Sequence, residues 1–528
     1  HASEGTAVIN IQNVGAFATG TGTTTVNATG VINLDGGYFS INGPVVNNGG
    51  SFNFISGELN VAQDLAIGSG AFLGDNLMLT SNQVLNVAGT TTIDPFHTLT
   101  LDGATFTTST ITIDGTLDFP SGRLGITGAG GLTVGGAGPF GPSLVVVSGQ
   151  TIDVTNITTV EAGATLDANS SGNFLAGNLA NSGQLTGNGT VQATLANTSS
   201  GEVFVASGEQ LRINGSGHTN AGQFTISSGT LNFDGNVTNQ ASGLVFVSGT
   251  GTYRADGGTT NDGILALSAL PTVVGDVTNN ASGQILVTGG TTTFFDDVTN
   301  NGSLQISTGA TAVFFGTYSG AGTSGAGAAR FEGDLKPGNS PAAITFGGDV
   351  SFGPAASLEA ELGGTLAGTE YDQINVFGQA TLDGLLQVSF LTLSLPTPGD
   401  EFEIMTFASR VGEFDMITGA GLLNADTALV PVYDATSLTL VTAIPGDLNL
   451  DGVVNGLDAN AISINFNASG VGYQAGDANF DGVVNGLDAN LIAINFNKTN
   501  PATAVPEPRS AMLLLIGLVA WANRRRNR

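Results

Sequence analysis

The sequence has no cysteine and is poor in basic residues, with 12 lysines and arginines against 42 acidic residues in a chain of 528. The absence of cysteine excludes disulfides, thiolate metal sites and cysteine nucleophiles. The formal net charge of −30 implies a surface that repels phosphate backbones and attracts divalent cations. Composition therefore excludes nucleic acid as a partner and favours a metal ion.

Charged residues make up only 10% of the chain, whereas hydrophobic residues reach 41% and there are 80 glycines. The hydrophobic content is too high for a disordered chain, and abundant Gly, Thr, Asn and Val suit short strands joined by tight turns. Because the sequence begins at His1 rather than Met, we expect a processed mature chain or a fragment.

A turn element of the form Asn-x-(Ala/Ser)-Gly recurs through the middle of the chain. Its asparagines, 16 to 23 residues apart, are Asn181, Asn197, Asn220, Asn239, Asn261, Asn279 and Asn300. Between them lie runs such as 223–226, with the period of two expected of half-buried strands. Such a unit buries its apolar face only by stacking on its neighbours. We predict a mainly β fold, with a right-handed parallel β-helix over residues 1–332 whose asparagines stack. A string of β-sandwiches is the alternative.

Residues 333–443 contain better-separated strands and four segments that resemble the end of autotransporter-type passenger repeats. These segments are 334–341 (DLKPGNSP), 358–364, 371–376 and 380–388. The first is expected to be a loop. The resemblance implies terminal β-rungs and a β-cap over 333–443, because a last coil without a cap exposes an open sheet edge.

Two twelve-residue loops, 447–458 and 477–488, carry oxygen-bearing residues at alternating positions, and DGVVNGLDAN is identical at 451–460 and 481–490. Calcium takes six to eight oxygens, and a loop of this length supplies them from positions 1, 3, 5, 7, 9 and 12, with Gly at position 6 for the reversal. The candidate ligands are Asp447, Asn449, Asp451, Val453 (backbone carbonyl), Asn455 and Asp458, with Asp477, Asn479, Asp481, Val483, Asn485 and Asp488 in the second loop. We predict two calcium ions. Two coincidental Asx and Gly turns are the alternative, which the duplication disfavours.

Residues 444–500 resemble a type I dockerin, because each loop closes with Asp rather than Glu and lacks an entering helix. Apolar residues at i, i+4 and i+7 predict a short helix after each loop; they are Leu457, Ala461, Ile464, Leu487, Leu491 and Ile494. The resemblance implies a cohesin-like partner. Family members bind cohesin through hydroxyl residues at loop positions 10 and 11, where this chain has Gly456-Leu457 and Gly486-Leu487. A different envelope assembly partner is therefore the alternative.

The C-terminal segment 501–528 contains Val505, Pro506, Glu507 and Pro508, then an apolar stretch at 511–522 and a basic end. A twelve-residue helix spans about 18 Å, less than the roughly 30 Å of a bilayer core. The segment resembles a PEP-CTERM sorting signal. That resemblance implies a C-terminal hydrophobic helix transiently in the inner membrane, an exosortase-type processing enzyme, and export to the envelope, surface or extracellular matrix of a Gram-negative-type bacterium. A C-terminal amphipathic or core helix is the alternative.

Catalytic signatures are lacking: no GxSxG, HExxH or phosphate-binding loop occurs. The histidines are His1, His97 and His218, and the last two are expected to be solvated turn residues. Asp296 and Asp297 form an adjacent acidic pair, but neighbouring strand residues point to opposite faces, which disfavours a paired-carboxylate glycosidase. We predict a non-catalytic structural or adhesive surface protein. A dockerin-bearing protein that binds or degrades polysaccharide is the alternative.

Overall fold

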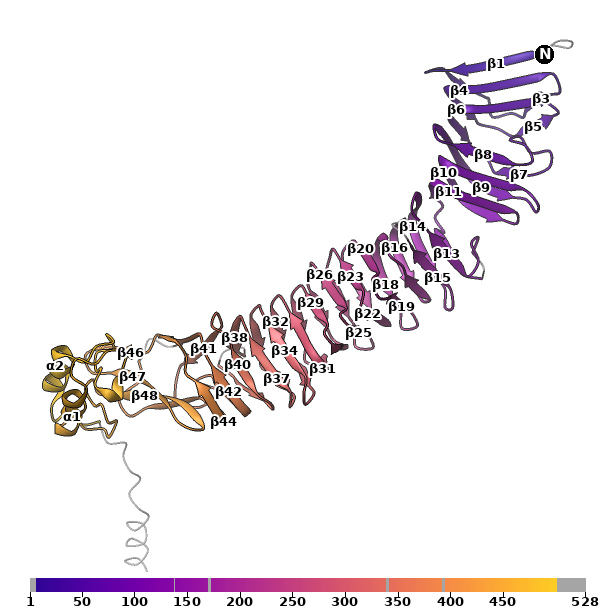
Figure 1. The fold of residues 1–528 in the computed structure, drawn as a ribbon. Coiled ribbons are helices and arrows are strands. Elements are labelled where there is room, and N and C mark those ends of the chain that lie inside the picture. Colours follow the sequence, from indigo (N-terminus) through magenta and orange to yellow (C-terminus); the bar gives the residue numbers. More distant parts are fainter. Residues whose placement is uncertain (1–5, 137, 170–171, 339–340, 392–394, 501–528) are drawn as a thin grey trace, which may run out of the picture. The chain divides into compact units, whose positions relative to one another are not determined.

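The computed structural model describes residues 6–500 except 137, 170–171, 339–340 and 392–394. The chain divides into two compact units, one comprising residues 1–318 with 322–329 and the other residues 319–321 with 330–528. Both are built mainly of short strands, and neighbouring strands stack side by side within each unit (Figure 1).

The first part of the N-terminal unit consists of strands that pair in parallel from one coil to the next. Its strands are β1 (Ala7–Gln12), β2 (Ala16–Ala18), β3 (Thr24–Asn27), β4 (Gly30–Ile41), β5 (Val45–Asn48), β6 (Ser51–Val61), β7 (Leu65–Ile67), β8 (Leu77–Thr80), β9 (Gln83–Ile93), β10 (Thr98–Ile113), β11 (Thr116–Ile126), β12 (Leu132–Val134), β13 (Ser143–Val146), β14 (Gln150–Val160), β15 (Thr165–Ala168), β16 (Asn173–Asn181), β17 (Gln184–Thr186) and β18 (Thr190–Asn197).

The second part has a regular coil of three strands, in which every third strand pairs in parallel with its equivalent. Its strands are β19 (Glu202–Val205), β20 (Gln210–Asn214), β21 (His218–Asn220), β22 (Gln223–Ser227), β23 (Thr230–Phe233), β24 (Val237–Asn239), β25 (Leu244–Gly249), β26 (Thr252–Ala255), β27 (Thr259–Asn261), β28 (Ile264–Ala269), β29 (Thr272–Val274), β30 (Val277–Asn279), β31 (Gln284–Phe294), β32 (Val298–Asn300), β33 (Ser303–Ile306), β34 (Thr311–Phe314), β35 (Tyr318–Gly320), β36 (Thr323–Ser324) and β37 (Ala328–Phe331).

Inward and outward side chains alternate along each coil. In β22, Phe224 and Ile226 are fully buried, whereas Gln223 and Thr225 are half-buried on the outer face. The same inward positions recur in the next coil as Val245. The predicted β-helix is therefore confirmed, and the β-sandwich alternative is wrong because successive strands stack in parallel rather than form antiparallel sheets.

The predicted asparagine ladder is present, and its members are completely buried. Each amide nitrogen donates to the side-chain oxygen of the next asparagine at 2.7–2.8 Å, from Asn181 to Asn300. The last amide donates to the hydroxyl of Tyr318 at 2.9 Å. A following glycine lets the turn close, because a Cβ at Gly243 would lie 2.3 Å from the Asn239 side-chain oxygen.

The C-terminal unit continues with parallel strands and ends in antiparallel ones. The strands are β38 (Asp334–Pro337), β39 (Ala343–Phe346), β40 (Val350–Phe352), β41 (Ser357–Leu362), β42 (Gln373–Leu382), β43 (Leu385–Phe390), β44 (Glu401–Gly412), β45 (Met416–Thr418), β46 (Gly421–Leu422), β47 (Ala428–Tyr433) and β48 (Ser437–Ala443). β48 pairs antiparallel with both β44 and β47. Residues 334–337 form a strand rather than the predicted loop, because Asp334 and Leu335 pair in parallel with β41.

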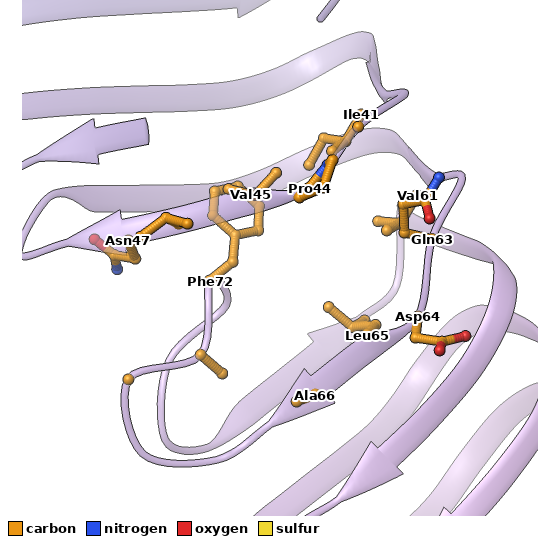
Figure 2. A pocket seen from close by; sticks show the side chains of 14 residues that line it. Ile41, Pro44, Val45, Asn47, Val61, Gln63, Asp64, Leu65, Ala66 and Phe72 are labelled. Atoms are coloured by element: carbon orange, nitrogen blue, oxygen red, sulfur yellow. The ribbon is translucent and has the colours of Figure 1, made fainter. Parts of the chain in front are cut away.

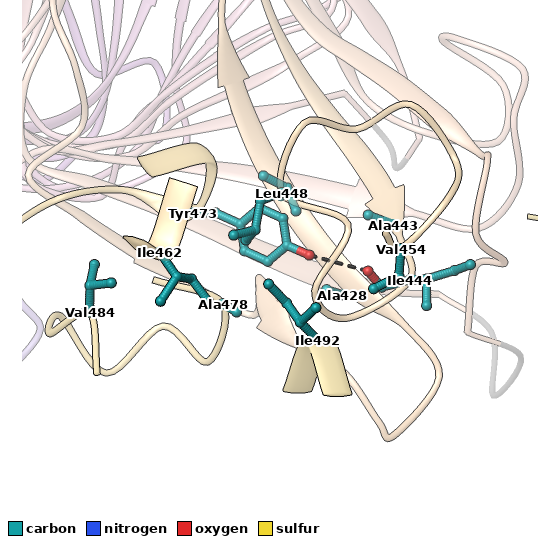
Figure 3. Close-up of a cluster of buried hydrophobic side chains, with 11 residues drawn as sticks. Ala428, Ala443, Ile444, Leu448, Val454, Ile462, Tyr473, Ala478, Val484 and Ile492 are labelled. Atoms are coloured by element: carbon teal, nitrogen blue, oxygen red, sulfur yellow. Dashed lines mark hydrogen bonds between the residues drawn. The ribbon is translucent and has the colours of Figure 1, made fainter. Parts of the chain in front are cut away.

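Two short helices, α1 (Gly456–Asn465) and α2 (Gly486–Asn495), and a 3-10 turn, η1 (Tyr473–Ala475), follow the strands. Their apolar core is continuous with β47 and β48 (Figure 3). Ala428 and Ala443 of the strands pack in one buried cluster with Ile462 and Ile492 of the helices. No helix in residues 6–500, as far as these are described, is long and apolar enough to cross a membrane. The predicted C-terminal hydrophobic helix lies outside the described residues.

Candidate metal centre

The loop 447–458 is folded by Asx turns. The Asp447 carboxylate accepts hydrogen bonds from the backbone nitrogens of Asp451 (3.1 Å) and Gly452 (2.9 Å). The Asp451 carboxylate accepts one from Val453 N at 2.9 Å. Gly452 has φ +84°, a left-handed conformation that glycine adopts without a steric cost. These contacts curl the chain into a tight loop in which Asp447 and Asp458 are buried and Asn449 and Asp451 are exposed.

Asp458 closes the same loop from the first turn of α1 and is completely buried. Its Oδ1 accepts from Leu448 N (2.8 Å) and Asn449 N (3.1 Å), and its Oδ2 accepts from Asn455 N (2.8 Å). The side chain of Asn455 in turn accepts from Leu457 N at 2.8 Å, which completes a capping box. One carboxylate thus ties the beginning of the loop to the beginning of the helix.

The second loop repeats this geometry thirty residues later. Asp477 accepts from Asp481 N (3.1 Å) and Gly482 N (2.9 Å), and Asp488 accepts from Asn479 N (3.1 Å) and Asn485 N (2.7 Å). The sequence repeat is therefore also a repeat in hydrogen bonding.

Each of the two loops is hydrogen-bonded to the other half of the module. Val454 N, in the second half of the first loop, donates to Lys498 O beyond α2 at 3.1 Å. Val484 N, in the second half of the second loop, donates to Ala468 O beyond α1 at 2.9 Å. Each loop is therefore held by the chain that follows the other helix, so the two halves fold as one unit.

The electrostatics of the loops favour a cation. Burial, together with the nearby carboxylates of Asp458 and Asp451, raises the pKa of Asp447 to about 6, although hydrogen bonds from the Gly452 and Asp451 backbone nitrogens oppose this shift. Burial likewise raises the pKa of Asp477, whereas a hydrogen bond from the Asn479 amide lowers that of Asp481. Like charges gathered in a partly buried loop are stabilised by a positive charge among them.

The donor set fits a hard cation. Within the described ranges no three acidic or histidine side chains form a metal cluster by themselves, so each loop would complete its shell with asparagine and backbone oxygens. Calcium prefers oxygens of these kinds. The twelve candidate ligands stay a prediction.

Comparison with known families identifies the module. Residues 445–497 match the family model described as Dockerin type I domain. A search of curated proteins gives no match. Type I dockerin domains bind calcium and typically bind cohesin partners, and a dockerin domain points to an extracellular or surface protein. The mainly β solenoid therefore carries a dockerin domain at the end of its described part.

The two helices of the dockerin domain are confirmed, but of the apolar stripe that predicted them only Ala461 and Leu491 pack against the core. Leu457 and Ile464 are 66% and 71% exposed, whereas Asp458 and Ile462 are buried. Because Asp458 must point into the loop to close it, the helix is rotated so that the residue one turn later, Ile462, faces inward. In α2 the equivalent Asp488 and Ile492 are buried.

Packing of the dockerin domain against β48 was not anticipated from the sequence. The Tyr473 hydroxyl donates to Ile444 O at 3.2 Å (Figure 3) and accepts from Gly446 N at 3.1 Å. The Asn495 amide donates to Pro445 O at 2.8 Å. The only available signal was the apolar segment around Ile444 directly before the first loop.

His218 is completely buried, so its prediction as a solvated turn residue is wrong. It occupies an inward position of β21, its ring lies tilted against that of Phe233 with centroids 5.0 Å apart, and its Nδ1 accepts from Leu195 N at 3.1 Å. Burial lowers its pKa.

Asp296 and Asp297 cap turns on the surface of the coils. Their carboxylates accept from Gly275 N and Thr317 N, each at 2.7 Å, so each carboxylate serves a different neighbouring coil. The predicted sorting residues Val505, Pro506, Glu507 and Pro508 lie outside the described residues.

Proposed function

We propose that this chain is a non-catalytic, exported surface or matrix protein in which a β-solenoid carries a calcium-loaded dockerin domain for assembly. The observation that supports this most directly is the duplicated apolar surface of the two helices. Leu487 and Ile494 of α2 are 61% and 64% exposed, at the positions of Leu457 and Ile464 in α1. Phe466 and Phe496, one residue after each helix, are half exposed.

Large exposed apolar side chains gathered on one domain are typical of interaction surfaces. The partner proposed here is a cohesin-like protein or another envelope assembly protein. Because Gly456 and Gly486 supply no hydroxyl, the contact would rest on the apolar side chains rather than on side-chain hydrogen bonds at these positions.

Two calcium ions are part of the proposal. The first would be held by the predicted ligands of 447–458 and the second by those of 477–488. The ions would supply positive charge among the carboxylates, and the chain itself supplies the Asx turns, the capping boxes and the shared core that hold each loop in shape.

Sorting by the tail is also proposed. The Val505–Pro508 motif resembles a PEP-CTERM signal, and an exosortase-type enzyme would process the chain after transient residence in the inner membrane of a Gram-negative-type bacterium. Mass spectrometry of the C-terminus of the secreted protein tests this, because an intact terminus would contradict it.

The assembly role is tested with the full chain as bait for an envelope extract of the producing organism. A partner should be retained in calcium, lost in EDTA, and lost with the double variant Leu457→Asp/Leu487→Asp. Leu366→Asp is the matched control, since Leu366 is 62% exposed but lies outside the dockerin domain. If the double variant and the Leu366→Asp control retain the partner equally, the partner does not bind through the apolar side chains of the helices.

The alternative, a solenoid that binds or degrades polysaccharide, has its own test. The full chain is incubated with envelope and plant polysaccharides with and without calcium, and reducing ends and unsaturated products are measured. Release of either product would overturn the non-catalytic assignment.

A further inference from the structure

The N-terminal coils contain a break in their backbone ladder. β5 and β7 occupy the same face of consecutive coils, yet β5 pairs only with β3 and β7 pairs only with β9. At the preceding corner the coils still touch, because Ala62 N donates to Ile41 O at 2.9 Å. Beyond this corner no backbone hydrogen bond joins β5 to β7 among the described residues.

A partly open cavity of about 520 Å³ lies at the break, and Asn47, Gln63 and Asp64 contribute polar groups to its mainly apolar lining. Ile41 and Val45 line it from one coil, Val61 and Leu65 from the next, and Phe72 reaches toward Val45 from the loop after β7 (Figure 2). A volume of this size accommodates one large side chain with neighbouring main chain.

The free edge of β5 points main-chain groups into this break. Thr24 N of β3 donates to Pro44 O at 2.7 Å, and in a parallel ladder alternate residues bond to the same neighbour. Val46 and Asn48 therefore bond toward β3, and the N–H and C=O of Val45 and Asn47 face the opposite side. The side-chain oxygen of Asn47 is also buried without a hydrogen-bond partner within the described chain.

We propose that this break is a binding site for an extended polypeptide segment of a partner protein, which adds as a strand along β5. Its main chain would pair with Val45 and Asn47, and one apolar side chain would enter the cavity between Val45, Leu65 and Phe72. Only a peptide offers donors and acceptors at the spacing of alternate strand residues, about 7 Å.

The charge at the rim defines the partner further. Asp64 lines the cavity and accepts a hydrogen bond from Thr90 N at 2.7 Å, and no ion pair involves it among the described residues. The segment recognised is therefore an extended one that places a basic residue beside its apolar anchor. This site is separate from the dockerin domain and does not depend on the function proposed for it.

The first test is binding of a labelled peptide, acetyl-Lys-Val-Thr-Val-Lys-Val-amide, to the full chain, followed by fluorescence anisotropy. Val45→Lys, which charges the cavity, should weaken binding by about tenfold or more. Val145→Lys is the matched control, because Val145 is similarly exposed on the outer side of a strand, β13, does not line the cavity and should change binding by less than about twofold. No saturable binding, or equal loss in both variants, overturns the proposal.

The second test separates strand addition from general apolar binding. The same peptide N-methylated at alternate residues keeps its side chains but lacks the donors that would pair with β5, so its binding should be lost. In hydrogen exchange, the amides of Val45 and Asn47 should exchange faster than that of Val46 and become protected by the unmodified peptide. Equal binding of the methylated peptide would show a site for apolar groups of any kind and overturn strand addition.

Discussion

The asparagine coils and the dockerin loops use the same kinds of residue, Asn, Asp and Gly, in repeated turns, but only the coils complete their own hydrogen bonding. In the coils each side-chain amide after Asn181 both donates and accepts, so Asn220, Asn239 and Asn261 satisfy one another. In the loops the carboxylates of Asp447, Asp451 and Asp458 only accept when ionised. A repeat of amides therefore stabilises itself, whereas a repeat of carboxylates accumulates negative charge, which a cation would offset.

The largest expected effect is that of removing calcium. Chelation by EDTA should destabilise the C-terminal unit and leave the N-terminal unit unchanged, because only the former contains the loops. A ligand present at about a thousand times its dissociation constant contributes about 4 kcal/mol. Scanning calorimetry of the full chain measures both transitions.

Two variants control this experiment. Asp447→Asn/Asp477→Asn should abolish the response to EDTA, and Asp296→Asn/Asp297→Asn should keep it. Ala443 and Ile444 pack in the same core as the two helices. The loss of stability on calcium removal should therefore extend to β47 and β48. A melting profile that EDTA leaves unchanged would contradict the calcium assignment.

Breaking the amide ladder should have the next largest effect. Asn239→Ala leaves the Asn220 amide and the Asn261 oxygen without their partners in a buried position, at a cost of about 3 kcal/mol. Thr238→Ala, on the outer side of the same strand, should cost less than about 1 kcal/mol. Denaturant unfolding of the N-terminal unit measures both, and equal costs would show that the ladder contributes little.

Asp372 should make the C-terminal unit less stable as the pH rises. Its carboxylate is buried and accepts from Ala342 N (2.8 Å) and Glu361 N (2.9 Å), and burial raises its pKa to about 6. The folded state then binds more protons than the unfolded one between about pH 4 and 6, so stability falls by up to about 3 kcal/mol across this window. The pH dependence of unfolding at saturating calcium measures it.

The matched variant for this prediction is Asp372→Asn. It loses one backbone hydrogen bond and should lower stability at low pH, but the fall between about pH 4 and 6 should become shallower. An unchanged slope in the variant would assign the pH dependence to other groups.

The smallest expected effect concerns the open end of the ladder. Asn181 Oδ1 is buried without a partner in the described structure, and Val160 lies opposite Asn181 in the preceding coil. Val160→Thr places a hydroxyl donor there and should be within about 1 kcal/mol of neutral. Val134→Thr, one coil earlier, buries a hydroxyl without this partner and should cost about 1–3 kcal/mol. If the two variants lower the free energy of unfolding by the same amount, the Asn181 oxygen does not accept a hydrogen bond from the new hydroxyl, and the prediction is wrong.

Most of the correct predictions rest on patterns among residues that are close together in the sequence. The alternation in runs such as Gln223–Ser227 determines which side of a strand is buried, and the spacing of the asparagines sets the length of a coil. The loop residues 447–458 are close in sequence, so their turns follow from short-range hydrogen bonds.

The errors arose where distant residues meet. His218 looked like a turn residue because its sequence neighbours are Gly217 and Thr219, but its position is set by pairing with Val237 of the next coil. Likewise, Asp334 lies in a strand because β41 pairs with it, which no local pattern of the proline-rich segment indicates.

The sequence by itself determined the repeat length, the strand periodicity and the two acidic loops, because each depends on residues close together along the chain. Only the tertiary structure decided which face of α1 is buried, where the amide ladder ends, that the dockerin core is shared with β47 and β48, and that β5 has a free edge. Each of these depends on which residues from distant parts of the chain come into contact, and hydrogen bonds and buried surface exist only once they do.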